Sequence, residues 1–209
     1  MSSLHKKKLT RAKVVVLGNE GCGKTAFTVR LLTKRFIGEY SQNEAEMTYR
    51  QAMDFAGECI NLELRDIKSE LLKKDESIQL ESAIKWADGF VLIYAVDDRE
   101  SFNAVSDFRK FIDITKRTVN TPAIIVGNKT DSVNREVTKE EGERISENLK
   151  CPFYELSVAE SYEDVKTSFD GILLEMRSEY FKHLAAVEKF SRAIHMKPFK
   201  STRSRSKTM

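Results

Sequence analysis

The sequence is poor in the residues that build disulfide scaffolds and metal centres. Among its 209 residues there are only three cysteines and three histidines: Cys22, Cys59, Cys151, His5, His183 and His195. An odd number of widely separated cysteines argues against a disulfide framework, and no spacing among the cysteines and histidines matches a zinc site. We therefore expect a protein of a reducing compartment whose histidines are solvated surface groups.

Long apolar runs are also absent. No run approaches the roughly 20 apolar residues of a membrane-spanning helix, and the first residues do not form the apolar core of a signal peptide. The apolar share of 41% and the charged share of 32% are those of a soluble globular domain. The length suits one sizeable domain with tails. These features predict a cytoplasmic protein, with the nucleus as the alternative location.

The usual signals for a lipid anchor are missing as well. No cysteine follows Cys151, and residue 2 is serine where N-myristoylation needs glycine. Positive charge nevertheless collects at both ends: residues 1–13 hold five Lys or Arg and no acid, and residues 182–209 hold eight against one acid. Such ends can contact anionic membrane weakly, act as a nuclear address, bind nucleic acid or remain inert. We expect no stable membrane anchor, nucleic-acid contact only through the basic tail, and a monomer.

The apolar pattern alternates strands with helices along the chain. Strands are predicted at 11–17, 48–55, 59–65, 89–96, 123–126 and 153–156. Helices are predicted at 24–34, in a short segment that ends near residue 86, around 102–112, from 138 to 149, and from 161 to about 190. The second and third strands are joined by a short turn and so form a hairpin. This order predicts a three-layer α/β fold with a mostly parallel six-stranded sheet and one antiparallel edge strand.

A glycine-rich loop separates the first strand from the first helix. Residues 18–25 match the pattern G-x-x-x-x-G-K-[ST], which in a strand–loop–helix context indicates a phosphate-binding loop. Glycines let the backbone N–H groups point inward, and the helix N-terminus adds partial positive charge. The pattern places Lys24 at the β- and γ-phosphates and the Thr25 hydroxyl on Mg²⁺. The predicted nucleotide contacts are Gly18, Glu20, Gly21, Cys22, Gly23, Lys24, Thr25 and Ala26. The alternative is a glycine-rich turn that binds no ligand.

A second motif, Asn128-Lys129-Thr130-Asp131, directly follows the buried strand at 123–126. An aspartate in this pattern can accept hydrogen bonds from the exocyclic amine and the ring N–H of guanine, which adenine does not offer in that arrangement. Asn128 and Lys129 are expected to brace the glycine loop and the base. After the last strand, residues Ser157, Val158 and Ala159 are placed to close over the base with backbone N–H groups. The sequence therefore predicts a guanine-nucleotide site.

These motifs, in this order, resemble a small GTPase of the Ras family over residues 11–180. The runs at 32–40, 86–90 and 161–165 are most similar to the branch around the Ras-related and estrogen-regulated growth inhibitor. The resemblance implies a P-loop NTPase fold of the Ras type, bound GTP or GDP with Mg²⁺, and effector or regulator proteins as partners. It also implies that Phe36 lies across the guanine edge and that Asp66 holds Mg²⁺ through water, beside Thr25.

The resemblance divides the chain into three parts. They are a basic N-terminal extension at 1–10, a Ras-like GTP-binding domain at 11–181, and a basic, largely disordered tail at 182–209.

The sequence departs from the family pattern where catalysis is concerned. Glu20 stands where the family usually has glycine, and its side chain either obstructs the catalytic water or points to solvent. The family threonine that reports the γ-phosphate is missing, with Asn43 or Glu44 in its place. In the second switch, the γ-phosphate-binding glycine is replaced by Ser69, and Glu70 takes the place of the water-orienting glutamine.

These departures leave two hypotheses. The first is a slow, atypical GTP/GDP switch with weak hydrolysis and no confidently assigned catalytic residue, Glu70 being the stand-in for the missing glutamine. The second is a module that holds nucleotide statically and presents a surface to partners. A further departure from the family pattern is Ala159, which stands where the family has a lysine that packs on the base. A phosphotransferase of the P-loop kinase type is disfavoured by the guanine-reading motif and by the lack of a recognisable acceptor lid.

Overall fold

The computed structural model describes residues 8–36, 47–67, 77–118 and 120–195. Within them the elements follow the predicted order. The strands are β1 (Arg11–Leu17), β2 (Met47–Phe55), β3 (Glu58–Asp66), β4 (Gly89–Ala95), β5 (Ala123–Asn128) and β6 (Phe153–Glu155). The helices are α1 (Lys24–Thr33), α2 (Ser77–Trp86), α3 (Arg99–Lys116), α4 (Lys139–Leu149) and α5 (Tyr162–His195).

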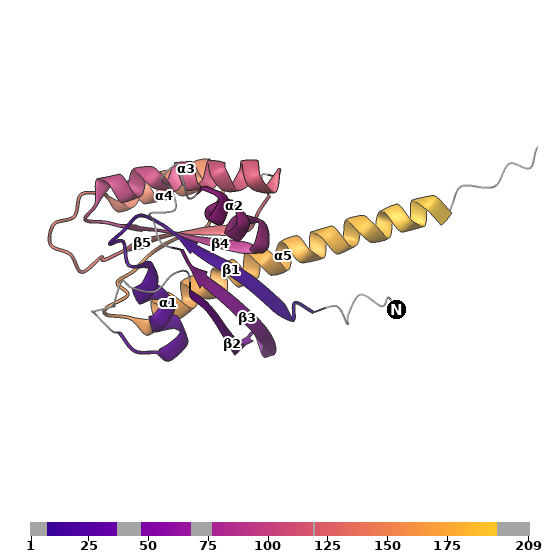
Figure 1. Cartoon of the computed structure of the whole chain (residues 1–209), viewed down its shortest axis with the longest axis horizontal. Coiled ribbons are helices and arrows are strands. Elements are labelled where there is room, and N and C mark those ends of the chain that lie inside the picture. The colour runs from indigo at the N-terminus through magenta and orange to yellow at the C-terminus, as the bar shows by residue number, and fades with distance from the viewer. Residues whose placement is uncertain (1–7, 37–46, 68–76, 119, 196–209) are drawn as a thin grey trace, which may run out of the picture.

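The described strands form one six-stranded sheet in the order β2-β3-β1-β4-β5-β6. The β2–β3 pair is antiparallel and every other neighbouring pair is parallel. Helices α2, α3 and α4 lie on one side of the sheet, and α1 and α5 on the other (Figure 1). The predicted three-layer α/β fold, with a mostly parallel sheet and one antiparallel edge strand, is confirmed.

Two apolar clusters hold the layers together, one on each face of the sheet. Every residue of β4 and β5 is buried, as the predicted continuous apolar runs require. These two neighbouring strands therefore form a rigid base whose carboxyl ends cannot shift without disturbing both clusters.

The last helix is longer than the sequence predicts. α5 runs to His195, about five residues past the predicted end near residue 190, and it includes residues 182–195 of the part that we assigned to a largely disordered tail. Its first half packs on the sheet and supplies the helical nucleus, after which each added residue gains one hydrogen bond for one residue fixed. Ala185 and Ala186 favour this continuation because of their helix propensity. None of the helices among the described residues combines the length and the apolar character needed to cross a bilayer.

Helix α3 begins at a side-chain cap at the end of β4. The Asp98 carboxylate accepts hydrogen bonds from the backbone N–H groups of Glu100 (3.0 Å) and Ser101 (3.2 Å). These are two of the donors that the first turn of a helix leaves without an intrahelical partner. The cap fixes where the chain turns from the carboxyl end of β4 into the helix.

We predict that Asp98→Ala lowers the free energy of unfolding by about 1 kcal/mol, because both N–H groups lose their acceptor. Urea unfolding measures this change. Asp98→Asn is the matched control, since an asparagine side chain also caps a helix, and it should cost much less. Equal losses in the two variants would show that the carboxylate charge, and not the cap, is responsible.

Candidate functional site

The predicted site residues collect at one edge of the sheet. β1, β3, β4, β5 and β6 are parallel, so their carboxyl ends point the same way. The pairing register places Val16 beside Asp66 and Ala95 beside Asn128. The segment 18–23, Asp66, the segment 128–131 and the segment 157–159 all leave the sheet at this edge. Crevices at such edges are where open α/β sheets bind their ligands.

The glycine loop depends on a close backbone approach at Gly23. This residue precedes α1 with a left-handed φ of 97°. A Cβ atom at Gly23 would lie 2.2 Å from Nδ2 of Asn128, which is far inside a normal contact. Glycine is therefore required here both by the backbone conformation and by the neighbouring amide. At Gly21 the φ is also positive, at 75°, but a Cβ would meet nothing within 4 Å.

Lys24 lies over the loop that precedes it. Its side chain is buried, and its Nζ donates a hydrogen bond of 2.8 Å to the carbonyl oxygen of Asn19. This holds the ammonium group against the backbone of the glycine loop. A buried ammonium with fixed direction is suited to an anionic ligand in that loop, because the loop N–H groups and the helix N-terminus carry the same sign of charge.

Thr25 and Asp66 bring a hydroxyl and a carboxylate together. The Thr25 Oγ1 donates a short hydrogen bond to Oδ2 of Asp66, although the two residues are far apart in sequence. Hard oxygen donors of this kind suit Mg²⁺, which usually takes one or two protein oxygens and completes its shell with phosphate and water. The described residues contain no cluster of three or more acidic, histidine or cysteine side chains that could hold a metal alone. Mg²⁺ at this pair would thus depend on nucleotide phosphates.

Asn128 connects two loops through its side-chain amide. Its Nδ2 donates to the carbonyl oxygen of Cys22 at 2.9 Å, and its Oδ1 accepts from the backbone N–H of Val158 at 3.1 Å. The residue is only 3% exposed. The glycine loop and the loop after β6 are therefore joined through one buried side chain. This is the bracing contact that the sequence assigned to Asn128.

Lys129 has a partner that the sequence did not reveal. Its Nζ lies 3.3 Å from Oδ1 of Asp97, which follows β4 at the same edge of the sheet. The backbone of Lys129 has a positive φ of 66°, so the chain turns sharply after β5. The only signal for Asp97 in the sequence was an acid just after a predicted buried strand, which many loops share. Asp97 is thus a site residue that sequence reasoning missed.

The remaining predicted residues differ in their exposure. Ser157 and Val158 are buried, whereas Ala159 and Asp131 are exposed. Phe36, after α1, is 44% exposed.

In the glycine loop, Glu20 is exposed and the Cys22 side chain is fully buried, and burial raises the pKa of its thiol. Cys22 is therefore positioned to act through its backbone. Gly18 is buried and Ala26 half-buried at the two ends of the loop. Asn43, Glu44, Ser69 and Glu70 lie outside the described residues.

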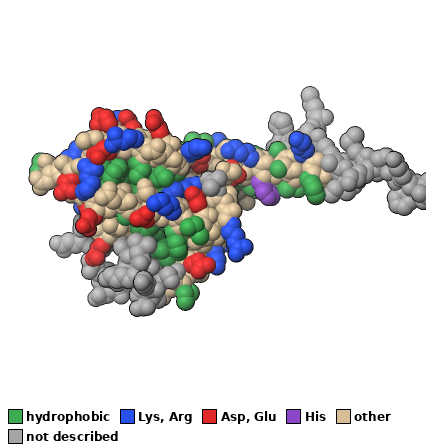
Figure 2. Space-filling view, turned by 90° about the horizontal axis from the view of Figure 1, so that it is seen from above, with side chains coloured by type: hydrophobic (Ala, Val, Ile, Leu, Met, Phe, Trp, Pro, Cys, Tyr) green, Lys and Arg blue, Asp and Glu red, His purple; other side chains and the backbone are tan. Residues whose placement is uncertain are grey.

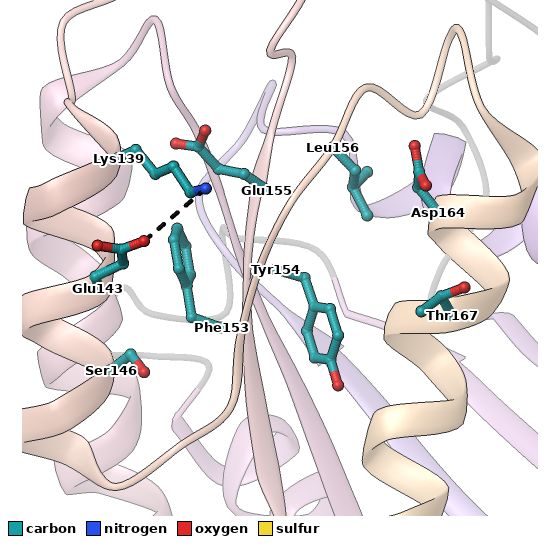
Figure 3. A pocket seen from close by; sticks show the side chains of 9 residues that line it. All are labelled: Lys139, Glu143, Ser146, Phe153, Tyr154, Glu155, Leu156, Asp164 and Thr167. Carbon is teal, nitrogen blue, oxygen red and sulfur yellow. Dashed lines mark ion pairs between the residues drawn. The ribbon is translucent and has the colours of Figure 1, made fainter.

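A separate hollow of about 480 Å³ lies between α4, β6 and α5 (Figure 3). Its lining includes the pair Lys139–Glu143 and the rings of Phe153 and Tyr154. None of the predicted nucleotide contacts lines it. The chemistry argued above therefore belongs to the edge of the sheet and not to this hollow.

The fold and this edge together define a P-loop protein with a guanine-type motif. Residues 13–178 match the Ras family, and the chain belongs to this family. It is 36% identical over 171 residues to the Ras-related and estrogen-regulated growth inhibitor of Homo sapiens, covering 81% of this chain and 83% of that protein. It is 40% identical over 174 residues to the Ras-related and estrogen-regulated growth inhibitor-like protein of Bos taurus, covering 80% and 84%.

A further relative is the Ras-like protein family member 11B of Danio rerio, 33% identical over 168 residues that cover 78% of this chain and 68% of the relative. The resemblance seen in the sequence is thereby confirmed. Family membership makes the chain a small GTP-binding protein of signalling, and members of this family generally bind GTP or GDP with Mg²⁺ and interact with effectors or regulators.

We predict that Gly23→Ala destabilises the protein by at least about 2 kcal/mol, because the new methyl group meets Asn128 and the backbone is strained. Gly21→Ala is the control: it has the same kind of φ strain but open space, and should cost about 1 kcal/mol. Urea unfolding at one fixed nucleotide concentration compares the two. If both variants lose the same stability, the close approach to Asn128 is not what requires Gly23.

Proposed function

We propose that the protein is a slow guanine-nucleotide switch that binds GTP and GDP tightly and hydrolyses GTP weakly. The observation that carries the proposal is the buried Asn128 side chain, which holds the glycine loop and the loop after β6 in contact. A ligand that spans both loops meets a site whose backbone is already ordered, so little conformational entropy is lost on binding. The proposed nucleotide-binding domain is residues 11–181, acting in the cytoplasm.

At the phosphate end, the N–H groups of residues 18–26 and the Lys24 ammonium receive the phosphates. Thr25 supplies a hydroxyl to Mg²⁺, and Asp66 binds the ion through water. The support for this assignment is the contact between the Thr25 hydroxyl and the Asp66 carboxylate, together with the buried position of Lys24.

At the base end, Asp131 reads the guanine edge and Lys129 lies along the ring. The pair of Lys129 with Asp97 supports this role, because it holds the lysine stem on the side where β4 and β5 end. Val158 and Ala159 contribute backbone groups toward the base, and Phe36 covers its edge.

Weak hydrolysis follows from the sequence of the loops around the γ-phosphate. The exposed Glu20 places a carboxylate on the phosphate loop, and its negative charge opposes further negative charge on a bound γ-phosphate. The family residues that contact the γ-phosphate are replaced by Asn43 or Glu44 and by Ser69. The family glutamine that orients the attacking water is replaced by Glu70. A ligand shifts a conformational equilibrium only through its differential affinity, so these losses also reduce the difference between the GTP and GDP states.

The same losses favour a second candidate, a module that holds nucleotide without turnover. In that case the protein would present the same surface to its partners whether GTP or GDP is bound. The two candidates differ in one observable property, which is the conversion of bound GTP to GDP.

We predict that the purified chain carries guanine nucleotide and binds GDP and GTP in a manner that weakens when Mg²⁺ is chelated. Lys24→Ala should lower nucleotide affinity about 100-fold, because a charge-assisted contact to phosphate is lost. Lys110→Ala, a surface lysine of α3, is the matched control and should bind normally. The assay is nucleotide exchange followed by calorimetry, with and without chelator. Affinity retained in Lys24→Ala would contradict the phosphate-loop assignment, and GTP that never becomes GDP would favour the static module.

We predict that Glu20→Gly raises the single-turnover rate of GTP hydrolysis about tenfold, because a carboxylate is removed from beside the γ-phosphate. Glu20→Gln keeps the size and removes the charge. A rise in both variants identifies charge as the obstruction, and a rise only in Glu20→Gly identifies bulk. An unchanged rate in both would show that Glu20 does not limit hydrolysis.

A further inference from the structure

Strand β6 forms an open edge of the sheet, since none of the described strands lies beyond it. Its bonds to β5 come from alternate positions: the carbonyl oxygen of Pro152 accepts one at 2.8 Å, and the N–H of Leu156 donates another at 2.9 Å. In a ladder of this kind, the residues between the bonded ones point their backbone groups the other way. The N–H and C=O groups of Phe153 and Glu155 therefore point away from β5, on the side where the hollow between α4 and α5 lies.

Two glycines let the side chains of β6 pack against the neighbouring helices. A Cβ atom at Gly142 of α4 would lie 2.3 Å from Cζ of Phe153, and a Cβ at Gly171 of α5 would lie 2.1 Å from the hydroxyl oxygen of Tyr154. Figure 3 shows the two rings on opposite sides of the strand, one toward each helix. Glycine inside a helix costs about 1 kcal/mol relative to alanine, and the packing of the rings offsets this cost. Because each ring is drawn to its helix, the backbone of β6 is left accessible between them.

Acidic side chains predominate in the lining of the hollow. They are Glu143 of α4, Glu155 of β6 and Asp164 of α5, against one base, Lys139. Glu155 is already engaged by Arg135 at 2.8 and 3.2 Å. The pair of Lys139 with Glu143 is loose, since the atoms are 3.9 Å apart and both side chains are more than half exposed. A cation in the hollow can therefore lie between carboxylates of two opposite helices.

The acidic environment is local to this part of the molecule. Burial raises the pKa of Tyr154, and the carboxylates of Glu175 and Asp170 raise it further. On the face that carries α2, α3 and α4, by contrast, acidic and basic side chains are interspersed (Figure 2). A basic ligand would thus be selected by contacts at the hollow and not by a field that extends over that whole face.

Open backbone groups and acidic side chains together decide which ligand fits. An anion, nucleic acid included, would be repelled by the carboxylates. A small cation would leave the backbone groups of Phe153 and Glu155 to water, and a second copy would bring the same acidic lining against itself. An extended peptide with basic side chains satisfies both features, because an added strand binds through main-chain hydrogen bonds while its side chains enter neighbouring pockets.

We propose that β6 accepts an extended basic segment of a partner protein as a further strand, in the hollow between α4 and α5. The segment needs about three or four residues, because β6 has three residues and a strand advances about 3.3 Å per residue. A lysine or arginine of the segment lies between Glu143 and Asp164. This binding is independent of the proposed switch, because none of the predicted nucleotide contacts lines the hollow.

The test is a titration of the isotope-labelled full chain, as purified, followed by NMR. The probe is a capped hexapeptide in which valine and lysine alternate. We expect its binding to slow hydrogen exchange of the Phe153 and Glu155 amides about tenfold, because these N–H groups gain acceptors. A peptide of valine and glutamate should bind at least about tenfold more weakly. The valine–lysine peptide with N-methylated amides keeps the charge but lacks the donors for strand pairing, and it should also bind at least about tenfold more weakly.

Variants of two exposed positions test the location. Glu143→Lys should raise the dissociation constant of the valine–lysine peptide about tenfold, because a carboxylate becomes a like charge. Asp107→Lys is the matched control, since Asp107 is also an exposed acid in a helical ion pair, and it should stay within about twofold. Thr167→Phe places a ring in the hollow and should weaken binding about tenfold, whereas Thr167→Ser should stay within about twofold.

Several outcomes would overturn the proposal. They are unchanged exchange at Phe153 and Glu155, equal binding of the N-methylated peptide, or equal losses in Glu143→Lys and Asp107→Lys. Spermidine that binds as tightly as the peptide would assign the hollow to small cations. Protection of the same amides in a concentration-dependent dimer, without peptide, would assign the edge to a second copy. The melting temperature should be the same in all protein variants, which keeps loss of peptide binding distinct from loss of folding.

Discussion

The relative position of the glycine loop and the loop after β6 depends on the side-chain amide of Asn128. Its two hydrogen bonds join Cys22, which lies 106 residues away in sequence, to Val158, which lies 30 residues away. A buried amide left without partners costs about 1–3 kcal/mol, so the two loops stay together as long as Asn128 stays buried. The same amide lies where any side chain at Gly23 would have to go. The position of Asn128 therefore fixes the conformation of both loops and also requires a glycine at position 23.

That constraint works because the strands beneath it are rigid. β4 and β5 are buried at every residue, and the register sets Ala95 beside Asn128. Asp97 and Lys129 follow these two strands and meet as an ion pair. The parallel arrangement therefore brings together groups that come from separate crossover units. Thr25 and Asp66 meet in the same way at the ends of β1 and β3. Asp66, Asp97 and Lys129 each lie at a strand end or within two residues of one, where a rigid sheet determines positions best, whereas Thr25 is held by the first turn of α1.

The sequence predicted what has a local signature. The glycine loop, the buried strands, the helix that starts near residue 138 and the order of elements all show in short windows, and the structure agrees with them. The pairing of Lys129 with Asp97 could not be read in this way, because it arises from strand register and not from spacing. The end of α5 was predicted about five residues too early. An apolar stripe that weakens looks like the end of a helix, although the packed half can propagate the helix through polar residues.

Helix α5 connects the two ends of the sheet. The helix begins directly after the loop that Asn128 holds, where the Ser161 hydroxyl accepts a hydrogen bond from the backbone N–H of Asp164. It then crosses the sheet and leaves at the end where β1 begins, opposite the glycine loop (Figure 1).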